Sequence, residues 1–291
     1  MSYNPTQATN GLGMTRVLRA AVLALGVTGM IYSITGSAAP AYSEDVARAM
    51  RAGDYDTARS LLRERAEAGE AEAQLNLGVL LATGQGGAPS PQEAVRWYRE
   101  AAEQGNASAQ NNLGRAYLEG MGVRRQPDTA ARWFRDAAEQ GDAGAQYNLG
   151  TLYAQGRGVE RDMTQAVQWW RKAAEQGVIA AQYNMGAASA DGVGVKQSDA
   201  AAVYWFANAA QAGNSRARGE LESYVSRLPT QRIGATNVQI RAGAGTDTPV
   251  ITRMQQGAKV SVLGRSRDDW TMIYMPEPQQ LGWVASRLLD E

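Results

Sequence analysis

The chain has 291 residues, with 29 basic and 29 acidic side chains and neither cysteine nor histidine. Without these two residue types it cannot form a disulfide framework, a Ser-His-Asp triad or an imidazole metal site. The zero net charge argues against the concentrated basic surface that nucleic-acid binding requires. We therefore expect no metal, no cofactor and no nucleic-acid partner.

The N-terminal segment predicts export. Arg16 and Arg19 precede a long, uncharged and mostly apolar stretch, and Ala39-Pro40-Ala41 fits the small-residue motif at which signal peptides are cleaved. Residues 1–41 are therefore predicted to be a signal peptide, with Met14 as an alternative start, and the mature protein to be periplasmic or secreted. The uncharged stretch is also long enough to span a bilayer, so an uncleaved anchor is the alternative.

A period of 36 residues governs the centre of the chain. Each copy carries the pattern Ala-Gln-x-Asn-Leu/Met-Gly, followed by a tryptophan, an alanine pair and a closing glycine at constant distances. The central glycines are Gly78, Gly114, Gly150 and Gly186, and the tryptophans are Trp97, Trp133, Trp169 and Trp205. Four full repeats therefore cover 70–213, and residues 42–69 look like a degenerate leading repeat.

Each repeat is predicted to be a pair of helices. In the second repeat, Asn106 is the expected N-cap, the glycines within 120–122 end the first helix, and Gly141 ends the second. Asp142 and Asn214 are the corresponding caps further along. A glycine inside a helix costs about 1 kcal/mol relative to alanine, so the central glycines indicate that another helix packs too closely for a side chain. The tryptophans are expected to pack inside the array.

This pattern resembles the Sel-1-like repeat, a relative of the tetratricopeptide repeat, over residues 70–213. The resemblance implies an α-solenoid whose groove binds a protein or peptide partner. Leu81 and Ser189 depart from the pattern, because the other repeats have tyrosine there. Residues 214–231 are predicted to form a capping helix that Pro229 ends, followed by a linker.

One asparagine in every repeat is the main candidate for binding in the groove. In tetratricopeptide-like arrays this register lines the concave surface, where a side-chain amide can hold a bound peptide backbone. The alternative is a hydrogen bond that ties successive repeats together. The four asparagines are Asn76, Asn112, Asn148 and Asn184, and the variable neighbours expected to set specificity are Leu75, Asn111, Tyr147 and Tyr183.

The C-terminal region changes to short alternating segments between Gly-, Asp- and Pro-rich turns, which predicts strands. Its pattern N-V-x-I-R-A-G-A-G-T…G-A-K-V-S-V-L-G…D-W…L-G-W-V resembles the bacterial SH3-like domain over residues 232–291. That resemblance implies a small barrel that binds peptidoglycan, a peptide or a protein. The candidate groove residues are Arg241, Trp270, Tyr274 and Trp283, although the tryptophans also fit a barrel core.

The predicted fold is thus a multidomain α + β chain: an α-solenoid of Sel-1-like helix-turn-helix repeats followed by a small SH3-like β-barrel. We expect a non-enzymatic adaptor of the cell envelope, whose groove binds a protein or peptide while the barrel, tethered by its linker, binds peptidoglycan or a second partner. One alternative is a membrane-anchored regulator of a signalling or cell-wall enzyme, which requires residues 20–41 to stay on the mature protein. Another is a hydrolase whose chemistry escapes motif analysis.

Overall fold

The computed structural model describes residues 44–290. The predicted signal peptide and the alternative anchor therefore lie outside the described residues. Among the residues described, no helix is long and apolar enough to cross a membrane. The chain divides into two compact units between Trp169 and Trp170.

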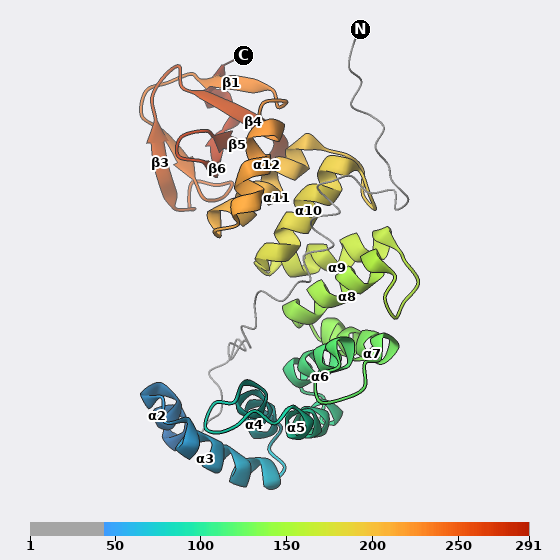
Figure 1. The fold of residues 1–291 in the computed structure, drawn as a ribbon. Helices are drawn as coiled ribbons and strands as arrows, with labels where there is room; N and C mark the ends of the chain where they lie inside the picture. Colours follow the sequence, from blue (N-terminus) through green and yellow to red (C-terminus); the bar gives the residue numbers. More distant parts are fainter. Residues whose placement is uncertain (1–43, 291) are drawn as a thin grey trace. The chain divides into compact units, whose positions relative to one another are not determined.

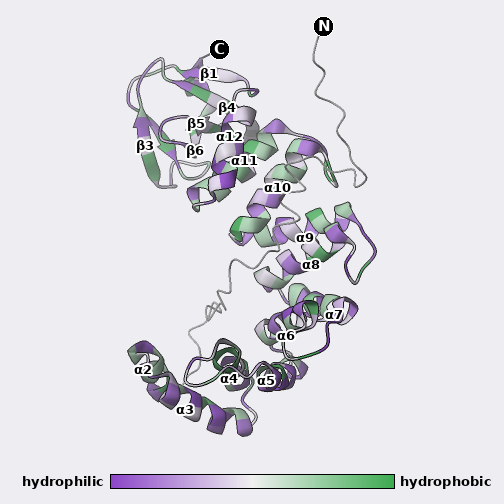
Figure 2. Ribbon diagram, in the orientation of Figure 1, coloured by the Kyte–Doolittle hydropathy of each residue, from purple (hydrophilic) through white to green (hydrophobic). Residues whose placement is uncertain are grey.

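The first unit is built from paired helices, as the repeat pattern predicts (Figure 1). Hydrophobic and hydrophilic residues share the same helices (Figure 2). The helices are α2 (Glu44–Ala52), α3 (Tyr55–Glu67), α4 (Ala71–Thr83), α5 (Pro91–Glu103), α6 (Ala107–Glu119), α7 (Pro127–Glu139) and α8 (Ala143–Gln155), while α9 (Met163–Glu175) contains the boundary.

Local sequence signals set the ends of these helices. The Asn106 side chain accepts a hydrogen bond from the Ala109 backbone nitrogen at 2.9 Å, and Asp142 caps α8 in the same way. Both α6 and α8 end at a glycine in the left-handed conformation, Gly120 and Gly156. The predicted N-caps and glycine stops of these helices are therefore confirmed.

The central glycines lie where the helices of one repeat approach each other. A Cβ atom built on Gly114 would lie 2.8 Å from the ring of Phe134, and one on Gly78 would lie 2.7 Å from the Tyr98 ring. A real Cβ does not come so close, so the predicted close packing is confirmed. The neighbour is an aromatic side chain of the second helix, supported by a buried alanine pair such as Ala101 and Ala102.

The second unit joins the last repeat to a small antiparallel sheet, as the fold-class prediction states. The strand order is β3-β2-β6-β5-β4-β1-β7. The elements are α10 (Ile179–Asp191), α11 (Asp199–Gln211), α12 (Ser215–Val225), β1 (Thr230–Ile233), β2 (Val238–Arg241), β3 (Val250–Met254), β4 (Lys259–Arg267), β5 (Trp270–Met275), β6 (Gln280–Ala285), the 3-10 turn η1 (Ser286–Leu288) and β7 (Leu289–Asp290).

The linker predicted at the end of 214–231 differs from the structure. Thr230, Gln231 and Arg232 pair with β4, and Arg232 also pairs with β7, so the segment is a strand of the barrel. Its polar side chains concealed this from the sequence, because only Ile233 enters the barrel core. The connection between α12 and the barrel is therefore four residues, 226–229.

Candidate functional site

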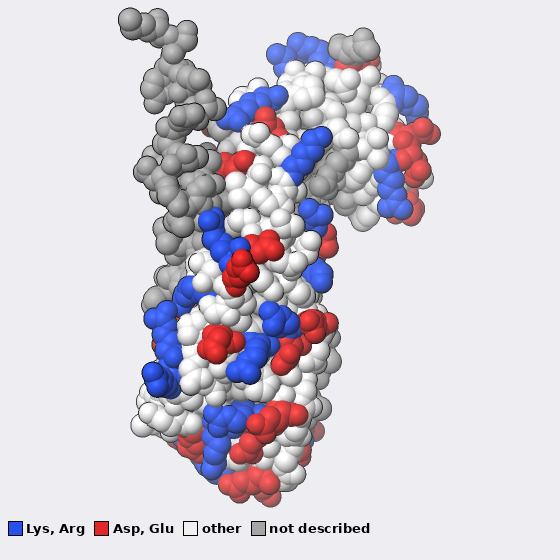
Figure 3. Space-filling view, turned by 90° about the vertical axis from the view of Figure 1, so that its right-hand side faces the viewer, with Lys and Arg blue, Asp and Glu red and all other residues white. Residues whose placement is uncertain are grey.

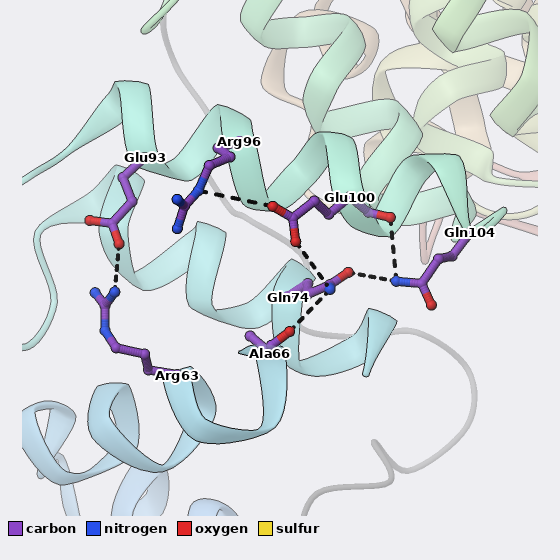
Figure 4. Close-up of polar contacts among 7 residues, drawn as sticks. All are labelled: Arg63, Ala66, Gln74, Glu93, Arg96, Glu100 and Gln104. Carbon is purple, nitrogen blue, oxygen red and sulfur yellow. Dashed lines mark hydrogen bonds and ion pairs between the residues drawn. The ribbon is translucent and has the colours of Figure 1, made fainter. Parts of the chain in front are cut away.

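A glutamine that recurs in every repeat ties each repeat to the one before it. The Gln74 side-chain nitrogen donates to the Ala66 carbonyl oxygen of α3 at 3.1 Å, and its oxygen accepts from Gln104 at 2.7 Å (Figure 4). The donor bond recurs at 3.2 Å from Gln110 to Ala102, from Gln146 to Ala138 and from Gln182 to Ala174. The sequence signal for this bond is the Ala-Gln pair, which is constant in the four repeats.

In the last repeat, Gln182 lacks the second glutamine that bonds its equivalents in earlier repeats. Gln140 donates to Gln110 at 2.7 Å, which repeats the bond between Gln104 and Gln74. Two repeats after Gln140, the equivalent position is Ala212, whose side chain has no amide. As a result, the Gln182 side-chain oxygen is buried without a hydrogen-bond partner among the described residues.

The four candidate asparagines occupy different environments. Asn76 is buried and donates to the Glu72 carbonyl oxygen of its own helix at 2.6 Å. Asn148 donates to the Asn111 side chain at 3.0 Å, a bond between α8 and α6. A Cβ on Gly144 would lie 2.9 Å from the Asn111 amide nitrogen, so a glycine leaves room for this pair. Asn148 thus matches the alternative in which the asparagine forms a hydrogen bond between successive repeats.

Asn112 faces a pocket of about 310 Å³ in the first unit, between α4, α5 and α6. Its polar lining includes the amide of Asn112 and the guanidinium of Arg115, and both residues are half-buried. The rest of the lining is largely apolar and includes Ala82, Ala94, Val95, Tyr98, Ala116 and Met121. A pocket with an apolar wall and a few polar groups suits an apolar side chain whose backbone needs a hydrogen-bond partner.

Asn184 lies in the second unit and is 1% exposed. Its side-chain nitrogen has no partner among the described residues. The adjacent Tyr183 packs against Phe206 with ring centroids 5.6 Å apart, and burial raises its pKa. Tyr147, in the first unit, is half-buried with a pKa raised by burial, whereas Leu75 is buried. The binding roles of these residues stay predictions.

A second depression, over α3, is charged rather than apolar. It measures about 530 Å³ and is lined by residues that include Arg59, Arg63 and Gly86. Arg63 pairs with Glu93 at 2.7 Å (Figure 4), and Arg59 donates to the Gly86 carbonyl oxygen at 2.9 Å. These arginines are therefore already engaged.

The face in Figure 3 shows basic and acidic side chains beside one another, which matches the balanced charge.

The repeat tryptophans pack as predicted. Trp97 and Trp205 are buried, and Trp133 and Trp169 are half-buried against the hydrophobic clusters of the repeats. These positions therefore serve the packing of the array.

The four candidate residues of the barrel share one face of its sheet. Trp283 is paired in register with Arg241 on β2 and Met272 on β5, and Trp270 and Tyr274 lie two residues either side of Met272. Arg241 is occupied internally, because its guanidinium donates to Thr248 and Gln239.

Only part of this face is open. Tyr274 is 3% exposed, and burial together with the carboxylate of Glu222 on α12 raises its pKa. Tyr274 therefore does not line an open groove, which corrects the sequence prediction. Trp270 and Trp283 are half-buried and remain partly accessible.

Models of two families match the chain. The Sel1 repeat matches at residues 71–106, 107–142, 143–178 and 179–214, and the bacterial SH3 domain matches residues 236–290. No curated protein matches.

Two solved structures are similar to the repeat region. One is a protective antigen of uropathogenic Escherichia coli that displays an SLR fold, with 39% identity and a TM-score of 0.56; the match covers 58% of this chain and 36% of the antigen, so this chain spans about a third of that protein. The other is a Sel1 repeat protein from Oxalobacter formigenes, with 36% identity and a TM-score of 0.54, covering 58% of this chain and 68% of that protein.

Proposed function

This chain belongs to the Sel1-repeat family and carries a bacterial SH3 domain, and from that combination we propose that it is a non-enzymatic scaffold of the cell envelope. The repeats bind a protein or peptide, and the barrel binds peptidoglycan or a second partner. Export rests on the predicted signal peptide at 1–41. The alternative, a membrane-anchored regulator of a signalling or cell-wall enzyme, requires the mature protein to retain residues 20–41.

The pocket beside Asn112 carries the first half of the proposal. An apolar side chain of the partner enters between α5 and α6, and the Asn112 amide bonds the partner's backbone at the rim. The preferred ligand is thus an extended segment with an apolar anchor.

Asn112→Ala is expected to weaken peptide binding about tenfold, because it removes one hydrogen bond worth about 1.4 kcal/mol. The probe is a peptide selected on the immobilised full chain from a random display library, and its affinity is measured by calorimetry. Asn148→Ala is the matched control, since Asn148 has the same register but bonds Asn111. Equal affinities for the two variants would place the peptide outside this pocket.

The accessible aromatic residues of the barrel carry the second half. Trp270 and Trp283 are half-buried on one face of the sheet, and indole rings present flat apolar surfaces on which a sugar ring can stack. The open part of this face is therefore where we place glycan binding. Arg241 supports it indirectly by holding the loop that contains Thr248.

Co-sedimentation of the full chain with purified peptidoglycan sacculi tests this half. The wild-type chain is expected in the pellet, and Trp270→Ala is expected to lower the bound fraction several-fold. Val250→Ala serves as the control, because Val250 is an exposed apolar residue on β3, 41% accessible. If the wild-type chain stays in the supernatant, the barrel binds a partner other than peptidoglycan.

A further inference from the structure

The second helix of the last repeat lacks the charged stripe that its equivalents carry. Three positions spaced four residues apart form one exposed stripe on a helix. They read Gln92, Arg96 and Glu100 in α5; Asp128, Arg132 and Asp136 in α7; and Thr164, Gln168 and Lys172 in α9. In α11 the same stripe is Ala200, Tyr204 and Asn208, which has no charge.

The α11 stripe is also less exposed. The three positions are exposed in α7 and α9, whereas in α11 all three are half-buried. Within the second unit, α11 packs against β4 and β6 of the barrel (Figure 1). The loss of charge therefore coincides with a barrel surface placed against this helix.

The barrel contributes an apolar surface to the same contact. Leu263, Met272 and Tyr274 are 3%, 7% and 3% exposed, yet none of them belongs to the hydrophobic core of the barrel. Met272 and Tyr274 lie on the outer face of β5, opposite to the core residues Ile273 and Met275. Something outside the barrel core covers them, and α11 contacts β4 and β6, the strands on either side of β5.

The connection allows little freedom. Only residues 226–229 separate α12 from β1, and the Pro229 carbonyl oxygen accepts a hydrogen bond from the Val262 nitrogen of β4 at 2.8 Å. Arg227 reaches back to Asp199 at the start of α11, with 3.6 Å between the charged atoms. Such a short, bonded segment does not behave as a flexible tether.

We propose that the SH3-like domain is a fixed end cap of the repeat array, with the buried part of the outer face of β4, β5 and β6, around Leu263, Met272 and Tyr274, docked on the uncharged stripe of α11. A solenoid must hide the apolar face of its last repeat, and here the barrel shares that task with α12. The inference holds whatever ligand the barrel binds. It also means that the last repeat and the barrel present their surfaces in one constant orientation.

Distance measurements between spin labels test the fixed geometry. The chain has no cysteine, so Arg218→Cys on α12 and Arg253→Cys on β3 give two unique labelling sites, and both native side chains are exposed. In the full chain carrying these two substitutions we expect one narrow distance distribution. A broad distribution, as a tether gives, would overturn the proposal.

Tyr204→Arg in that labelled chain gives the stripe the residue found in α5 and α7, and it alters no residue of the barrel. We expect the distance distribution to broaden several-fold while the near-ultraviolet circular dichroism of the barrel persists. Gln211→Arg is the matched control, since it adds the same charge at an exposed position of α11. A distribution that stays narrow in Tyr204→Arg would show that this stripe does not hold the barrel.

Discussion

Replacing Gly158 with alanine is expected to destabilise the first unit by about 3 kcal/mol, as left-handed strain and overpacking combine at one residue. Gly158 has φ +69°, and a Cβ there would lie 2.6 Å from the Asp128 nitrogen and closer still to the Pro127 carbonyl oxygen. The loop after α8 thus rests directly on the first residues of α7. Backbone atoms of a helix start cannot move aside as a flexible side chain can.

Gly141→Ala separates the two contributions. Gly141 has φ +99° but no atom within 4 Å of a built Cβ, so alanine there meets only the left-handed strain, about 1–2 kcal/mol. Urea unfolding of the full chain, followed by circular dichroism at 222 nm, gives both free energies. Equal losses for Gly158→Ala and Gly141→Ala would mean that the loop does not pack on α7.

A loop glycine equivalent to Gly158 recurs in other repeats, where it fixes the position of one 36-residue unit on the one before. Gly122 has φ +69° and approaches the start of α5 at Pro91, and Gly86 approaches the start of α3 at Tyr55. Each repeat therefore packs on the one before through its loop as well as through its helices. Because the strain is the same in every copy, the sequence must supply glycine every time.

Sequence reasoning succeeded where the cause is local or periodic. The N-caps Asn106 and Asp142 and the helix-interior glycines follow from the backbone, whose requirements one repeat already contains. The sequence could not show whether the glutamine or the asparagine forms the hydrogen bond between repeats. The positions of Gln110 and Asn112 are both constant in the four repeats, and only the direction of the side chain distinguishes them. The periodicity alone cannot supply that direction.

The barrel shows a second kind of limit. Tyr274 is on the face expected for ligand binding, yet it is buried, and α11 contacts β4 and β6, the strands on either side of β5. The sequence of a domain does not reveal which of its faces another domain occupies. The uncharged stripe at Tyr204 was visible in the sequence, but its meaning depends on the docked barrel.

Gln110→Leu is expected to lower the free energy of unfolding by about 2 kcal/mol, since it removes two hydrogen bonds worth about 1 kcal/mol each. Its nitrogen donates to the Ala102 carbonyl oxygen at 3.2 Å, and its oxygen accepts from Gln140 at 2.7 Å. Leucine fills a similar volume, so the loss reports the bonds rather than a cavity. The measurement is again urea unfolding of the full chain.

Gln182→Leu is the internal comparison, because Gln182 makes only the donor bond, to Ala174 at 3.2 Å. Its oxygen is buried and has no partner among the described residues, so replacement removes one hydrogen bond and also one buried unbonded acceptor. The expected loss is therefore below about 1 kcal/mol.

Ala212→Gln is the converse change: it introduces the amide that Gln140 provides two repeats earlier, and it is expected to add about 1 kcal/mol. That gain must vanish when Ala212→Gln is combined with Gln182→Leu, since the new amide then has no acceptor. A gain that persists in the double variant would show that the new amide does not act by bonding Gln182; helix propensity cannot supply such a gain, because it favours alanine over glutamine.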